Sequence, residues 1–285
     1  MIFRGIAACL FALGIAVNAA VAGECPGNPD ALGTSRVLYL DPADHPLVGS
    51  IQYRETLPLD DHEVVLTFDD GPIPPHTAHI LDILRGECVK ATFFSVGSMA
   101  RRSAAVLRRA YDEGHTIGGH SQNHPLNLPH LPPEVAWQEM ADGNASIMQA
   151  LGPTRQMAPF IRFPALNRTS DLEARARAKG LMVWSADMYA DDWMKITPEE
   201  VTRRPLERLD AAGKGVVLFH DIHARTVAAL PEFLKGLKQR GFKVVHVMPA
   251  GAGQAKTQTA LAQWHALDRS RLGLPAKMLA PHSEH

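Results

Sequence analysis

Apolar runs rich in β-branched residues alternate with segments of helical period along most of the chain. Seven runs have the length and composition of strands, and they cover residues 64–68, 91–95, 116–118, 160–163, 181–185, 216–219 and 243–247. Apolar residues recur every three to four positions in the intervening segments 77–85, 104–113, 133–151, 171–179, 198–211 and 226–240. Strands that alternate with helices predict a parallel sheet with crossover helices, so the predicted fold class is α/β.

Five polar motifs follow predicted strands. They read Thr67-Phe68-Asp69-Asp70-Gly71-Pro72, His120-Ser121-Gln122-Asn123-His124-Pro125, Arg162-Phe163-Pro164, Asp191-Asp192-Trp193 and Leu218-Phe219-His220. Parallel barrels build their active sites at the carboxyl ends of their strands, whereas an open doubly wound sheet gathers ligands at one switch point. Contributions from five strand ends therefore favour an incomplete barrel of about seven strands.

The first 22 residues have the pattern of an export signal. Arg4 supplies a positive charge, an apolar run covers 5–17, and Ala20-Val21-Ala22 is a small-residue cleavage site. We expect cleavage after Ala22 and a periplasmic or secreted protein. An uncleaved membrane anchor is the alternative, although the run is short for a bilayer span of about 20 residues.

The segments that flank the periodic region differ from it in composition. Residues 23–61 contain Pro, Gly and Asp clusters around a short apolar run, which predicts an ordered N-terminal extension. Residues 249–285 are small and polar, so we expect a flexible C-terminal tail with one weak helix near 260–267. The predicted catalytic domain is therefore 62–248.

Composition and charge narrow the class of protein. A hydrophobic content of 46% with 21% charged residues is typical of a globular domain. Lys plus Arg total 29 against 30 for Asp plus Glu, so we expect no nucleic-acid partner; the sequence does not define an oligomeric state. Signal cleavage leaves Cys25 and Cys88, which form either a disulfide or two separate thiols, and no CxxC pair suggests a cysteine zinc site.

Asp69 and Asp70 are adjacent acids at the end of a buried strand. Neighbouring side chains on a regular strand face opposite ways, so both can reach one site only where the strand twists and ends. Gly71-Pro72 supplies such an end. The alternative is an ordinary Asp-Asp-Gly-Pro surface turn.

His120 and His124 are spaced to bind one metal ion. Four residues apart, their imidazoles would face the same side of a single helical turn. Two histidines and one aspartate, with positions left for water and substrate, suit a catalytic Zn²⁺, and Co²⁺ or another divalent transition metal could occupy the same set. The alternative is a histidine pair that is incidental.

His220 and Arg162 each stand at the end of a predicted strand. A histidine pKa near 6.5 suits proton transfer to a leaving amine, and an arginine there can hold a carboxylate through paired hydrogen bonds. A core histidine and a surface salt bridge are the respective alternatives. Asp191, Asp192 and Trp193 lie on the loop after residues 181–185, where an aromatic ring beside acids suits a sugar platform; the alternative for Trp193 is a buried core position.

These motifs, in this order, resemble the polysaccharide deacetylase family, the NodB-homology or carbohydrate esterase family 4 domain, over about residues 62–248. Thr-Phe-Asp-Asp-Gly-Pro and His-Ser-X-X-His-Pro are its most specific signals. The resemblance implies a distorted (β/α) barrel. It also implies that Asp70, His120 and His124 bind the metal and that Asp69 is the catalytic base.

The same resemblance assigns His220 as general acid, Arg162 as the residue that orients Asp69, and Asp192 as the support of His220. Two departures stand out. Ala165 replaces the aromatic residue of the usual Arg-X-Pro-Tyr, although its backbone N–H can still serve as oxyanion donor. The acidic loop is longer than the usual Asp-X-X-Asp-Trp, so Asp187 or Asp191 could replace Asp192 as the support.

Because Ala165 leaves the aromatic wall of the substrate groove missing, we expect Tyr189 to supply that wall. The expected function is an exported metal-dependent hydrolase that removes N-acetyl groups from a polysaccharide or oligosaccharide with N-acetylglucosamine-type units. The expected partner is the saccharide, and a membrane only if the signal segment stays uncleaved. An O-acetyl esterase acting on an acetylated glycan and a noncatalytic glycan-binding protein are the alternatives.

Overall fold

A computed structural model of the protein describes residues 25–251 and 254–271. The predicted export signal, residues 1–22, lies outside this range, as does the end of the predicted tail. In the part of the chain that the structure describes, no helix has both the length and the apolar character needed to cross a bilayer.

Within residues 25–251 and 254–271, ten strands form one sheet in which all the strand pairings are parallel. They are β1 (Thr34–Leu40), β2 (Leu47–Val48), β3 (Glu63–Asp69), β4 (Thr92–Ser95), β5 (Thr116–Gly119), β6 (Phe160–Ile161), β7 (Met182–Trp184), β8 (Met188–Tyr189), β9 (Gly215–His220) and β10 (Lys243–Pro249). The order is β1-β10-β3-β4-β5-β6-β7-β2, and β9 pairs with β3 and β8. Among the described strands no ladder joins β2 to β8, so the sheet stays open there and the predicted incomplete α/β barrel is confirmed.

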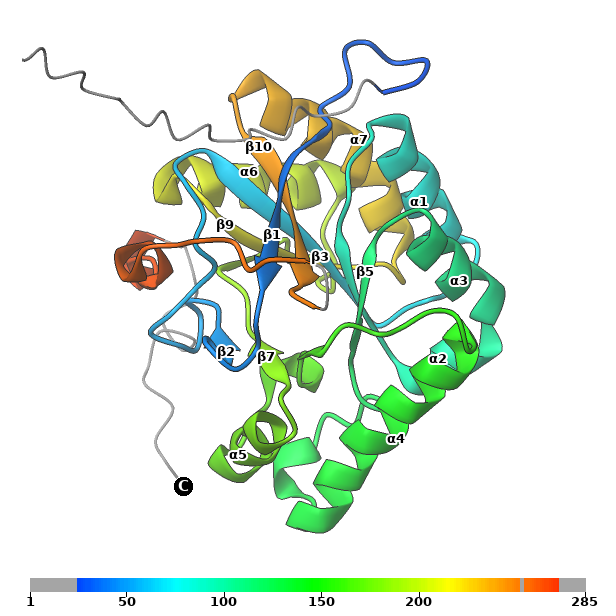
Figure 1. The fold of residues 1–285 in the computed structure, drawn as a ribbon. Coiled ribbons are helices and arrows are strands. Elements are labelled where there is room, and N and C mark those ends of the chain that lie inside the picture. Colours follow the sequence, from blue (N-terminus) through cyan, green and yellow to red (C-terminus); the bar gives the residue numbers. More distant parts are fainter. Residues whose placement is uncertain (1–24, 252–253, 272–285) are drawn as a thin grey trace, which may run out of the picture.

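The described part of the chain contains seven α-helices, which lie around the outside of the strands (Figure 1). They are α1 (His76–Gly86), α2 (Gly97–Arg102), α3 (Ala104–Asp112), α4 (Pro133–Leu151), α5 (Ser170–Ala178), α6 (Pro198–Ala212) and α7 (Ala224–Gln239). Local sequence explains several boundaries: Thr197 and Glu200 form a capping box at the start of α6, and Gly213 ends it in a left-handed conformation. The six predicted helices are present, and α2 is an additional short one.

Strand β3 is buried along its whole length and separates two apolar clusters. Val64, Leu66 and Phe68 face the helices and pack in the larger cluster, whereas Val65 belongs to an inner cluster enclosed by the sheet. Because side chains alternate along a strand, Thr67 and Asp69 face the same interior as Val65. The alternation of side-chain direction along β3 thus places Asp69 inside the barrel.

The inner cluster depends on residues outside the predicted catalytic domain. Its members from the flanking segments are Leu38, Leu40, Val48, Leu57, Leu59 and Trp264. Trp264 is buried and stacks on His45 with 3.5 Å between ring centroids. The sequence predicts a flexible tail after residue 248; in the structure its portion 254–267 lies against the N-terminal extension, with the Ala266 N–H donating to the Arg54 carbonyl. Cys25 and Cys88 form a disulfide.

Candidate active site

A cavity of about 330 Å³ opens at the carboxyl ends of the strands. Its lining residues are Asp69, Asp70, His120, His124, Leu126, Ala165, Leu166, Tyr189, Trp193, Leu218 and His220. Five sequence-predicted site residues therefore line one cavity. The other two lie directly behind the wall, with Arg162 bonded to Asp69 and Asp192 bonded to His220.

The adjacent acids reach one cavity because the backbone turns sharply between them. Asp69 is the last residue of β3, and Asp70 adopts a left-handed conformation with φ of 82°. That conformation rotates the Asp70 side chain away from the direction an extended strand would give it. The predicted strand-end geometry is present, and the surface-turn alternative is excluded because Asp69 is 2% exposed.

Asp221 holds this turn from below, a contact that the sequence analysis missed. The Gly71 N–H donates to Asp221 Oδ1 over 2.8 Å, and the Thr77 hydroxyl donates to Asp221 Oδ2 over 2.7 Å. Gly71 is required at this approach, since a Cβ built there would lie 2.0 Å from the carboxylate. Burial raises the pKa of Asp221 to about 7. The only sequence signal was an acid directly after a buried strand.

His120 and His124 converge, but through a loop and not through the predicted helical turn. Ser121 and His124 both have positive φ values, 66° and 57°, which a helical turn does not contain. The His124 N–H donates to the Ser121 hydroxyl, and α4 approaches so closely that a Cβ on Gly143 would meet the Ser121 carbonyl at 2.4 Å. Spacing alone predicted the convergence, but the loop depends on a helix that is distant in sequence.

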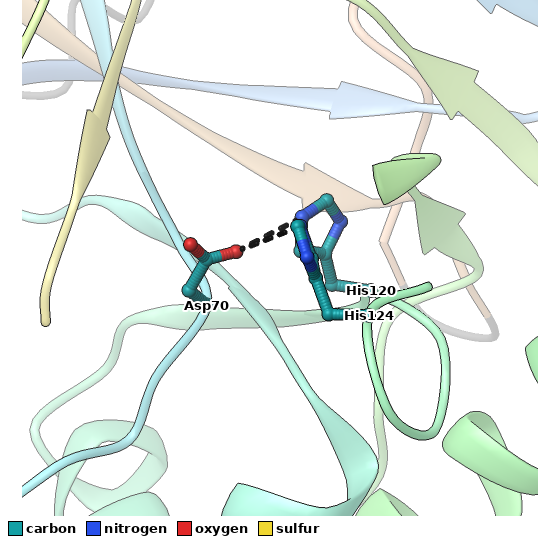
Figure 2. Close-up of side chains that lie close together, drawn as sticks. All are labelled: Asp70, His120 and His124. Carbon is teal, nitrogen blue, oxygen red and sulfur yellow. Dashed lines mark ion pairs between the residues drawn. The ribbon is translucent and has the colours of Figure 1, made fainter. Parts of the chain in front are cut away.

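Asp70, His120 and His124 form a group suited to a metal ion (Figure 2). One Asp70 oxygen, Oδ1, lies 3.3 Å from His120 Nε2 and 3.2 Å from His124 Nε2. His120 Nδ1 lies 2.7 Å from the Arg162 carbonyl, which accepts only if this nitrogen carries the proton. In neutral His120, Nε2 therefore presents a lone pair, as a metal ligand must.

Asp70 Oδ1 is itself buried without a hydrogen-bond donor, so acceptor atoms face one another across a space that a cation would stabilise. Burial raises the pKa of Asp70, but the neighbouring imidazoles, first His120 and then His220 and His124, hold it well below its usual range. The carboxylate is thus available as an anionic ligand. The donor set fits a divalent transition metal.

Arg162 is completely buried and fixes Asp69. Its Nη1 donates to Asp69 Oδ1 over 2.6 Å and to the Thr67 hydroxyl over 2.9 Å, while Nη2 donates to the Ser185 carbonyl. The guanidinium also lies over the Phe94 ring at 4.3 Å. Since Arg162 Nη1 occupies Asp69 Oδ1, the second oxygen, Oδ2, remains for the cavity and lies 3.8 Å from His120 Nε2.

Asp192 is the acid that contacts His220. Its Oδ1 lies 2.7 Å from His220 Nδ1, and its Oδ2 accepts from the His220 N–H and the Thr226 hydroxyl. Burial lowers the pKa of His220, but the charge and hydrogen bond of Asp192 outweigh it and raise the pKa to about 9. Because Asp192 contacts Nδ1, Nε2 is the ring nitrogen that can transfer a proton.

The two alternative acids have other partners. Asp191 accepts from Arg204 and Arg208. Asp187 is fully buried and accepts from the Ser50 N–H, the Thr56 hydroxyl and the Val216 N–H, so it joins the N-terminal extension to β9. The open choice between three acids is thereby settled in geometry: only Asp192 bonds His220.

The remaining predicted positions also lie at the cavity. Ala165 lines it and has a left-handed φ of 51° within a short 3-10 turn, Pro164–Leu166. Gln52 from the N-terminal extension donates to the Leu166 carbonyl and supports this turn. Trp193 is 40% exposed at the cavity and is therefore not the buried core residue of the alternative interpretation.

The chain resembles known deacetylases in sequence and in fold. Residues 57–184 match the polysaccharide deacetylase family. A chitooligosaccharide deacetylase of Rhizobium leguminosarum bv. trifolii is 31% identical over 202 residues, which cover 65% of this chain and 90% of that protein. The peptidoglycan-N-acetylglucosamine deacetylase PgdA of Listeria monocytogenes is 32% identical over 186 residues, covering 65% of this chain but only 38% of PgdA.

A solved structure of a deacetylase has a similar fold. The peptidoglycan deacetylase Bd3279 of Bdellovibrio bacteriovorus superposes with a TM-score of 0.68 at 31% identity, covering 79% of this chain and 61% of that one. The sequence match, the shared fold and the convergence of the sequence motifs around one cavity agree. The chain belongs to the polysaccharide deacetylase family.

Proposed function

We propose that the protein is an exported, metal-dependent deacetylase that removes N-acetyl groups from N-acetylglucosamine-type units of a polysaccharide or oligosaccharide and releases acetate. One observation carries the proposal, namely that three kinds of group share one cavity. They are the candidate metal ligands, the Asp69 carboxylate held by Arg162, and the His220 imidazole whose protonated form Asp192 stabilises. The named activities of the relatives, on peptidoglycan and chitooligosaccharide, support the substrate class.

Asp70, His120 and His124 would hold the ion, which we propose to be Zn²⁺ or another divalent transition metal. When bound, such an ion polarises a carbonyl oxygen and lowers the pKa of a bound water. Two imidazoles and one carboxylate leave coordination positions for water and substrate, as catalytic sites require.

Asp69 acts as the general base in this proposal. Arg162 binds Asp69 Oδ1, so Oδ2 accepts the proton of the attacking water. The fixed ion pair keeps this oxygen in one position and lowers the reorganisation that proton transfer would otherwise require. The Ala165 backbone N–H, at the cavity wall, serves as donor to the negative charge that develops on the acetyl oxygen.

His220 acts as the general acid. Asp192 keeps the ring protonated, and Nε2 delivers its proton to the sugar nitrogen as the carbon–nitrogen bond breaks. Acetate and a free amine are the products. A protein that only binds glycan would need neither the buried Arg162–Asp69 pair nor the Asp192–His220 pair, both of which are costly to bury.

Export is the part of the proposal that rests on residues 1–22. The disulfide between Cys25 and Cys88 supports it, because such bonds persist in oxidising compartments and are rare in the cytosol. The proposed location is the periplasm or the extracellular space.

Acetate release tests the proposed function. Zinc-loaded protein is assayed on peptidoglycan, tetra-N-acetylchitotetraose and acetylated xylan, with and without chelator. We expect acetate from an N-acetylated substrate and its loss on chelation. Release from xylan alone would identify an O-acetyl esterase, and saccharide binding without any release would identify a noncatalytic protein.

The variant Asp69→Asn provides the internal control. It keeps the shape of the carboxylate but accepts a proton poorly, so turnover should fall by roughly 10²- to 10⁴-fold. Zinc content should stay at the wild-type level, because Asp69 is not in the ligand group. Wild-type turnover in this variant would remove the assignment of Asp69 as base.

A further inference from the structure

Strand β8 places an aromatic side chain in the cavity wall. It pairs with β9 in parallel, with Met188 opposite Val217 and Tyr189 opposite Leu218. Met188 is fully buried, whereas Tyr189 lines the cavity, as the alternation of side chains along a strand requires. This two-residue strand gives Tyr189 a fixed position on the sheet.

The backbone of Tyr189 is held on both sides. Its carbonyl accepts from Arg208 Nη1 over 2.5 Å, and the next N–H, of Ala190, donates to the Leu218 carbonyl over 2.9 Å. Arg208 is anchored in turn by Asp191. The ring is therefore presented by a rigid element, and little conformational entropy is lost when a ligand contacts it.

Tyr189 and Trp193 form an aromatic corner. Their rings meet edge to face, with 5.0 Å between centroids and an angle of 78°. Trp193 makes a second edge-to-face contact with His220, at 5.6 Å and 74°. The corner thus adjoins the proposed proton donor, at the place where the sugar that carries the reacting acetamide must lie.

The Tyr189 hydroxyl has no hydrogen-bond partner among the residues that the structure describes. Burial raises its pKa to about 12, with Arg162 opposing this effect and Asp191 and Asp69 adding to it. The group is consequently neutral at physiological pH and can both donate and accept a hydrogen bond. A pyranose offers the matching chemistry, an apolar face of C–H groups edged by hydroxyls.

We propose that Tyr189 is a substrate-contacting residue, whose ring forms with Trp193 the platform for the acetylated sugar and whose hydroxyl binds a polar atom of that sugar. The inference rests on the proposed function and deepens it, because it names a residue that selects sugar-linked acetyl groups over other acetyl groups. Leu126, 65% exposed at the cavity, extends the same apolar surface.

Steady-state kinetics on zinc-loaded protein test the proposal with two substrates, tetra-N-acetylchitotetraose and 4-nitrophenyl acetate, which carries no sugar. Tyr189→Phe keeps the platform but removes the hydroxyl, so KM for the saccharide should rise by roughly 3- to 10-fold. Tyr189→Leu also removes the aromatic face and should raise KM further. In Tyr189→Leu, the loss in kcat/KM for 4-nitrophenyl acetate should be smaller than the loss for the saccharide by a factor of about ten.

Tyr111→Phe is the matched control, because Tyr111 lies on α3 away from the cavity lining and should keep wild-type constants. An unchanged saccharide KM in Tyr189→Phe would overturn the hydroxyl contact, and an unchanged KM in Tyr189→Leu would overturn the platform. Equal losses on both substrates would mean that Tyr189 acts through the catalytic groups and not through the sugar. If wild-type protein hydrolyses only the ester, the proposed deacetylase function fails, and the inference fails with it.

Discussion

Replacing Asp192 by asparagine should lower the pKa of His220 and leave the rest of the site unchanged. In the native protein Asp192 contacts the ring at Nδ1 and the backbone N–H of the same residue. Asparagine keeps the size of the side chain and one acceptor oxygen but carries no charge. The cavity and the metal ligands should therefore remain, while the main influence that raises the pKa of His220 is lost.

The structure sets the magnitude. Burial lowers the pKa of His220, while Asp192, and more weakly Asp70 and Asp69, raise it, so without Asp192 the pKa should fall from about 9 to roughly the ordinary 6.5. That change of about 2.5 pH units corresponds to about 3 kcal/mol. At pH 8 the protonated fraction would drop from about 90% to about 3%, roughly a 30-fold loss of the proposed acid, whereas at pH 6 the loss would be under about twofold.

The sign of the stability effect follows from the same shift. The folded-state pKa lies above the ordinary 6.5, so the Asp192–His220 pair stabilises the fold fully below pH 6.5. This contribution is lost as the pH rises through about 9. Asp192→Asn should therefore cost more unfolding free energy at pH 6 than at pH 9.

Nuclear magnetic resonance of the imidazole nitrogens measures the pKa directly in metal-free protein. Asp191→Asn is the matched control, because Asp191 binds Arg204 and Arg208 and has no bond to His220; its His220 pKa should stay near 9. A His220 pKa that remains above about 8 in Asp192→Asn would refute the reasoning, since another group would then be holding the proton.

Three further outcomes are expected. His120→Ala should lose zinc under dialysis that leaves wild-type protein loaded, while the half-exposed His62→Ala should stay loaded, as metal analysis would show; equal retention would contradict the ligand assignment. Asp221→Leu leaves the Gly71 N–H without its acceptor and should weaken zinc affinity about tenfold or more, whereas Asp221→Asn keeps an acceptor and most of the affinity; equal affinities in a chelator competition would rule out the turn as the cause. His246 is buried with its pKa lowered to about 3, so the fold should lose about 2 kcal/mol from this residue between pH 7.5 and pH 5, and urea unfolding of His246→Gln should lack that loss; a pH dependence equal to that of wild type would contradict it.

Most strands and helices were predictable from local sequence, including the two-residue β6 within the predicted strand 160–163, but β1, β2 and β8 were not predicted as strands. Helix α4 begins and ends where its apolar spacing and Pro133 predict. Strands β2 and β8 have two residues each, which is too short for any period to be visible, and each exists only because a longer partner strand lies beside it. Tertiary pairing, not local preference, defines such strands.

The candidate site divides in the same way. The acids of β3 and the histidine pair were recognisable because the relevant residues are close in sequence. The residues that hold these groups in place were less visible in the sequence. Thr67 and Asp221 form hydrogen bonds with residues about 95 and 150 positions away. The choice of Asp192 over Asp187 likewise depended on which acid the fold placed against His220, since both follow the same strand.

The inner apolar cluster limits how this protein can be re-engineered. Its side chains at 38, 40, 48 and 264 lie outside the region that matches the family, and each fully buried aliphatic residue contributes roughly 1.5–3 kcal/mol. A chimera that exchanges only residues 57–184 with those of a relative would join two halves of a core that were shaped for different partners. Grafting a new substrate preference onto this scaffold should therefore begin at the rim loops and leave the barrel interior intact.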